Sequence, residues 1–76
     1  MMTIAKDVPI SVDKDVLSGV PVFTGTRVPI SAMLENLEAG VSLDEFVENF
    51  PTVTHSQAVR VLEHFRSTLN DISLAA

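Results

Sequence analysis

The sequence predicts a mainly α protein, in which a three-helix bundle follows a short N-terminal β arm or hairpin. Residues 1–29 hold three of the four prolines and two of the three glycines, and their apolar residues alternate with polar ones. Residues 30–70 instead repeat apolar residues at helical spacing in three successive segments. A chain of 76 residues forms one domain. We divide it into the arm (1–29), the bundle (30–70) and a short tail (71–76).

The arm is expected to contain two short strands, Val8–Val12 and Val20–Phe23, because both stretches alternate with a period of two. Pro9 and Pro21 lie in or beside these strands. Proline cannot donate a ladder hydrogen bond, so both strands are predicted to be edge strands. The stretch DKDVLSG between them is predicted to be a turn, and Gly25 supplies the positive φ of a second, tight turn.

The first helix is expected to begin after Pro29, with Ser31 as its cap, and to stop at Gly40. Its apolar stripe has the spacing i, i+3, i+4, i+7 and consists of Ile30, Met33, Leu34 and Leu37. Ser42, with a glutamate three residues later, begins the second helix with a capping box, and Pro51 ends it. The second stripe consists of Leu43, Phe46, Val47 and Phe50.

The third helix is predicted over residues 55–70 and is the longest, with Thr54 and Gln57 as a second capping box. Its core face is expected to consist of Ala58, Val61, Leu62, Phe65 and Leu69. Three short helices with tight turns, the last of them longest, have the helix-turn-helix or homeodomain-like plan. Many small three-helix bundles share this pattern, so it does not by itself assign a function.

The composition argues against several classes of protein. There is no cysteine, so disulfides and thiolate metal sites are excluded and a cytoplasmic location is expected. No apolar run approaches the ~18 residues that span a bilayer. His55 and His64 fall on opposite sides of a helix, which argues against a shared metal ion. The sequence has no catalytic triad spacing, thiol nucleophile or phosphate loop, so we expect no enzymatic activity, no cofactor and no small-molecule substrate.

The hydrophobic fraction suggests a partner. It is 46%, whereas a chain this short buries only about 60% of its unfolded surface. A second copy of the chain would cover the surplus most simply, so a homodimer is expected. Pairing through the exposed edges of Val8–Val12 and Val20–Phe23 is the expected contact. The alternative is a well-filled core with scattered exposed valines and leucines.

The net charge of the chain restricts any DNA binding to a small local patch. Ten acidic residues against five basic ones give a net charge of −5, which disfavours nonspecific binding to phosphates. In a helix-turn-helix protein the first turns of the last helix contact base edges. The candidate DNA-binding residues are therefore Thr54, His55, Ser56, Gln57 and Arg60. Gln57 suits adenine and Arg60 suits guanine or phosphate. Alternatively, they are ordinary polar residues on a solvated face.

The first two helices carry acidic side chains and no basic ones between residues 35 and 48. These acidic residues are Glu35, Glu38, Asp44, Glu45 and Glu48. A DNA backbone would repel them, so either DNA touches only the third helix and the arm, or this surface recognises a protein. The carboxylates form either a simple solvated face or a docking surface for a basic partner.

The segments GVPVFTGTRVPIS and LENLEAGVSLDEFVENFPTVTHSQAVRVLEHF resemble the family known as domain of unknown function 433. The resemblance covers about residues 10–66. The positions that match its pattern are Gly19, Pro21, Gly25, Thr26, Arg27, Pro29, Leu34, Leu37, Gly40, Ser42, Phe50 and Pro51. It implies a homeodomain-like fold with a β arm. It also implies a VapB-type antitoxin, whose partners would be a PIN-like nuclease toxin and operator DNA.

Such antitoxins usually neutralise the toxin with a C-terminal extension, and here only residues 71–76 follow the third helix. The candidate toxin contacts are therefore the acidic residues of the first two helices or the apolar tail residues Ile72 and Leu74. Alternatively, the chain is a solitary member of the family that has no toxin.

Arg27 lies between the tight turn and the first helix, next to Gly25 and Thr26. These three residues are candidates for a structural role or for contact with a partner. A guanidinium at this place can bind backbone carbonyls or a carboxylate and so hold the arm on the bundle. We therefore expect loss of Arg27 to lower stability more than binding. Contact with a phosphate or a partner is the alternative.

Overall fold

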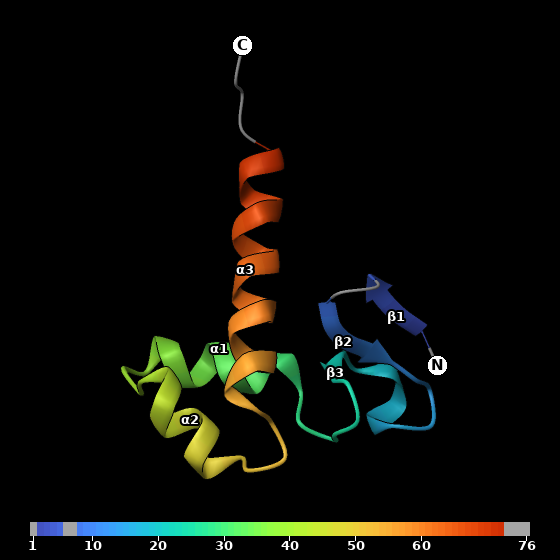
Figure 1. Ribbon diagram of the computed structural model, residues 1–76. Helices are drawn as coiled ribbons and strands as arrows, with labels where there is room; N and C mark the ends of the chain where they lie inside the picture. Colours follow the sequence, from blue (N-terminus) through green and yellow to red (C-terminus); the bar gives the residue numbers. More distant parts are fainter. Residues whose placement is uncertain (1, 6–7, 73–76) are drawn as a thin grey trace.

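The computed structural model describes residues 2–5 and 8–72. Its elements are β1 (Met2–Ala5), β2 (Val8–Val12), the 3-10 turn η1 (Leu17–Gly19), β3 (Val22–Phe23), α1 (Ile30–Glu38), α2 (Leu43–Asn49) and α3 (His55–Asp71). Helix α3 rises from a base made by α1 and α2, and the β arm lies beside its lower half (Figure 1). The mainly α fold with three helices and an N-terminal β arm is confirmed.

The three strands form one antiparallel sheet in the order β1-β2-β3, so β2 is the central strand. The expectation that Pro9 marks an edge strand is wrong. Pro9 is accommodated because the register between β1 and β2 shifts between Thr3 and Ala5, next to the pair of Ala5 with Val8. The carbonyl of Pro9 still accepts a hydrogen bond from the N–H of Thr24 at 3.0 Å.

The far side of β3 is covered by the chain that leads into α1. Val22 forms a bridge with Pro29, and the N–H of Phe23 donates to the carbonyl of Val28 at 3.0 Å. The N–H of Ile30 donates to the carbonyl of Pro21, also at 3.0 Å. The prediction that Val8–Val12 and Val20–Phe23 offer free edges to a second copy is therefore wrong, because neighbouring segments of the same chain pair with both.

Local capping sets the helix boundaries. The hydroxyl of Thr54 accepts from the N–H of Gln57, and the side-chain oxygen of Gln57 accepts from the N–H of Thr54, each at 3.0 Å. This capping box is confirmed. Gly40 follows the end of α1 with a φ of +89° and donates to the carbonyl of Leu37, as a helix stop requires. Ser31 is not a cap, because α1 already begins at Ile30, directly after Pro29.

The core draws on β2, β3 and all three helices, and on the turn between α2 and α3. Its members are Ile10, Phe23, Ile30, Met33, Phe46, Val53, Ala58 and Val61. The rings of Phe23 and Phe46 lie 6.1 Å apart, and both side chains are fully buried, so they join the arm to the bundle. Leu69 was predicted to be a core residue, yet it is 64% exposed because α3 continues past the layer of helices that could cover it. None of the helices in the described residues has the length and apolar character needed to cross a membrane.

Candidate functional site

The start of α3, where DNA contact was predicted, is bound to the fold. Gln57 uses its side-chain oxygen in the capping box, and its Nε2 donates to the carbonyl of Thr24 at 3.0 Å. This second hydrogen bond joins α3 to the turn at the tip of the arm. Each end of the amide therefore makes one hydrogen bond within the fold, and Gln57 is half-buried. The contact with adenine predicted for this residue would have to compete with these two hydrogen bonds, and it stays a prediction.

The other predicted DNA contacts do not form a basic surface. Nε2 of His55 lies 3.5 Å from a carboxylate oxygen of Asp44, and both side chains are exposed. The nearest charged group to His55 is thus negative, which opposes the approach of a phosphate. Ser56 and Arg60 are exposed. Arg60 lines a shallow hollow together with Glu63 and with Val8 of β2.

The turn Gly25–Arg27 is held by Thr26 and not by Arg27. The hydroxyl of Thr26 donates to the carbonyl of Phe23 at 2.8 Å and accepts from the N–H of Val28 at 3.0 Å. Gly25 has a φ of +80°, which side chains with a Cβ rarely adopt. Thr26 and Gly25 therefore have a clear structural role, and the positive φ predicted for Gly25 is confirmed.

Arg27 itself is exposed, and its guanidinium forms no hydrogen bond or ion pair with residues 8–72. The expectation that Arg27 holds the arm on the bundle is wrong, because Gln57 makes the side-chain hydrogen bond between them. Arg27 lines an open hollow of about 520 Å³ together with Asp13, Thr26 and Thr52. The alternative, contact of Arg27 with a phosphate or a partner, stays a prediction.

The acidic side chains of α1 and α2 all point to solvent. The exposed residues are Glu35, Glu38, Asp44, Glu45 and Glu48. Within the described part of the chain, Asp44 with His55 is the only close pair of a carboxylate and a basic side chain. The other predicted partner contact that the structure describes, Ile72, is 70% exposed. Leu74 lies outside the described residues.

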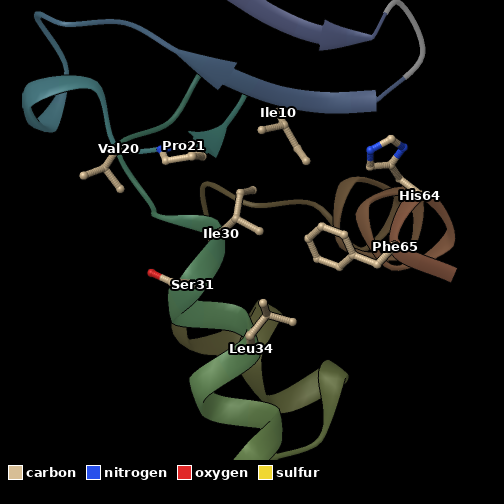
Figure 2. Close-up of a pocket in the computed structure, with 8 residues that line it drawn as sticks. All are labelled: Ile10, Val20, Pro21, Ile30, Ser31, Leu34, His64 and Phe65. Atoms are coloured by element: carbon tan, nitrogen blue, oxygen red, sulfur yellow. The ribbon is translucent and has the colours of Figure 1, made fainter. Parts of the chain in front are cut away.

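An apolar groove lies between the arm, α1 and α3, and sequence reasoning missed it. Figure 2 shows its lining residues, which are Ile10, Val20, Pro21, Ile30, Ser31, Leu34, His64 and Phe65. The groove has a volume of about 340 Å³ and opens to solvent. Phe65 projects toward Ile30, and Ile10 closes the end nearest the sheet (Figure 2). The spacing of apolar residues predicted only that Leu34 lies in the stripe of the first helix and Phe65 on the core face of the third, because spacing does not reveal where the opposing layer ends.

The comparisons with known proteins place this chain by family and fold. No curated protein matches it. The crystal structure of a DUF433 member protein from Anabaena variabilis, at 2.00 Å resolution, has the same fold with a TM-score of 0.68 and 20% sequence identity. The alignment covers 86% of this chain and 64% of that one. The family model for proteins of unknown function called DUF433 matches residues 10–65, and the chain therefore belongs to the DUF433 family.

Proposed function

We propose that this protein is a non-enzymatic protein-interaction module with a helix-turn-helix plan, and that it does not recognise a DNA sequence. The observation that carries this proposal is the engagement of Gln57, whose amide binds Thr54 on one side and Thr24 on the other. The residue best suited to contact a base is thereby part of the structure that joins the arm to α3.

The energies favour this assignment. Moving Gln57 to a base edge would break two hydrogen bonds, each with a net contribution of about 1 kcal/mol, and would leave a part-buried carbonyl without its donor. A good bidentate contact with a base contributes about 1–3 kcal/mol. Replacing the two internal hydrogen bonds by one base contact therefore gains little binding free energy. The carboxylates of α1 and α2 add repulsion from the phosphate backbone.

The partner that best fits the charge distribution is a basic protein on α1 and α2. Residues 28–54 contain no lysine or arginine, and the five acidic side chains there are exposed. Complementary potentials speed the encounter of two proteins and fix their relative orientation. An antitoxin that binds a PIN-like nuclease is the specific form of this proposal, in line with the family resemblance.

Fluorescence anisotropy tests the proposal that the protein does not recognise a DNA sequence. It compares binding to the promoter of the protein's own gene with binding to a scrambled duplex of equal length. At ~150 mM salt we expect weak binding that differs less than about threefold between the two duplexes, because the net charge of −5 and the engaged Gln57 leave few contacts. Arg60→Ala is expected to change neither value. A preference of tenfold or more for the promoter, lost in Arg60→Ala, would restore the operator-binding assignment.

Co-expression with the product of the neighbouring reading frame, followed by titration calorimetry, tests the proposal that a nuclease binds α1 and α2. Reversing two charges on the acidic helices, in Glu38→Lys with Glu48→Lys, is expected to weaken binding at least tenfold, because charge pairs across an interface contribute on this scale. The control carries the same total change of charge elsewhere, in Asp15→Lys with Glu63→Lys, and should bind normally. Equal weakening by both pairs would mean that only net charge matters and that α1 and α2 are not the docking surface.

A further inference from the structure

The apolar stripe of α3 continues beyond the bundle. Leu62 and Phe65 are half-buried against the core, whereas Leu69 and Ile72 are 64% and 70% exposed. The spacing of these four residues, three or four positions each, places them on one face of the helix. Every residue from 66 to 72 is exposed, and this half of α3 stands clear of the other elements (Figure 1). A helix end whose apolar face is left uncovered by the described residues is unusual in a monomer.

This stripe continues directly from the groove. Phe65 lines the groove, and Leu69 lies one helical turn further along the same face. Across the groove, Val20 and Leu34 are 40% and 38% exposed. Together these side chains form one apolar surface that runs from the arm and α1 to the end of α3. We call it the α3 surface. It consists of the half-buried Phe65 and the exposed residues Val20, Leu34, Leu69 and Ile72.

We propose that a second copy of this chain covers the α3 surface. The ends of the two α3 helices pack antiparallel around a two-fold axis near Leu69. Ile72 of each copy then lies over Phe65 and the open side of the groove in the other copy. Such a contact is isologous: the same apolar surface of each copy is buried against that of the other, and the assembly is a closed dimer.

The charges on α3 allow this pairing, although the whole chain is acidic. From residue 60 onward the helix carries Arg60, Arg66, Glu63 and Asp71, so its formal charges cancel. The excess of carboxylates lies mainly on α1 and α2 and in the turn after β2. Two copies can therefore join through α3 without bringing net charges of the same sign together. The contact does not use the acidic side chains of α1 and α2, so it does not depend on the proposed function.

Sedimentation equilibrium from 1 to ~100 μM tests this interface. The wild-type chain is expected to sediment as a dimer, and Leu69→Asp should raise the dimer dissociation constant at least about 30-fold, because it places a carboxylate at the centre of the contact. The control Ser67→Asp adds the same charge on the opposite face of the helix and should leave the constant unchanged. A wild-type monomer at ~100 μM would overturn the proposal, as would equal effects of both substitutions.

Cross-linking tests the antiparallel arrangement separately. The chain contains no cysteine, so Leu69→Cys introduces a single thiol close to the proposed two-fold axis, where a symmetric disulfide has the required geometry. Mild oxidation should convert most of this variant into a covalent dimer on a non-reducing gel. Ser67→Cys, with its thiol on the outer face, should stay monomeric on the gel. Equal cross-linking of the two variants would show that α3 does not pair in this way.

Discussion

Phe46→Ala is expected to lower the free energy of unfolding by about 3–5 kcal/mol, the largest effect of any single substitution considered for this protein. Phe46 is fully buried in α2, and its ring lies 6.1 Å from Phe23 in the arm and 4.9 Å from Phe50. Removing the ring leaves a cavity between the arm and the bundle. A domain of 76 residues has a total stability of about 4–11 kcal/mol, so a large share of it would be lost.

Urea unfolding followed by far-UV circular dichroism measures this effect, since the chain has no tryptophan or tyrosine for fluorescence. Phe50→Ala is the matched control, because it removes the same atoms from a half-buried position at the end of the same helix. It should cost about 1–2 kcal/mol, less than half of the effect at Phe46. Similar losses in the two variants would argue against Phe46 as the centre of the core.

Gln57→Ala is expected to lower the free energy of unfolding by about 2–3 kcal/mol, although the side chain lies near the surface. The substitution removes the acceptor for the N–H of Thr54 and the donor to the carbonyl of Thr24. Gln57→Glu separates the two contributions. Its carboxylate can still accept from Thr54, as in an ordinary capping box, but it has no hydrogen to donate to Thr24. We therefore expect Gln57→Glu to cost about 1–2 kcal/mol at neutral pH.

Arg27→Ala is the control for the Gln57 variants in the same urea experiment. Arg27 was the residue expected to hold the arm, yet it is exposed and has no hydrogen bond to residues 8–72, so its loss should change stability by less than about 0.5 kcal/mol. The order Gln57→Ala, Gln57→Glu, Arg27→Ala, from largest loss to smallest, is the expected result. A loss above 1 kcal/mol for Arg27→Ala would return the structural role to the arginine.

The sequence by itself determined the helices and their ends. The capping box of Thr54 and Gln57, the helix stop at Gly40 and the stripe around Phe46 were each predicted and are each present in the structure. These features depend on residues within four positions of one another, whose relative geometry is fixed once a helix forms. The mainly α class, the three helices and the β arm followed from the same local periodicity.

Only the tertiary structure decided which polar residue joins the arm to the bundle and which strand is central. Gln57 and Thr24 are 33 positions apart, whereas Arg27 is closer to the junction in sequence but is exposed. The groove and the uncovered end of α3 could not be predicted from the sequence either. The spacing of apolar residues identifies the apolar face of a helix but not the point at which its neighbours end. Contacts of this kind depend on how separate elements pack, and the partners in that packing are not neighbours along the chain.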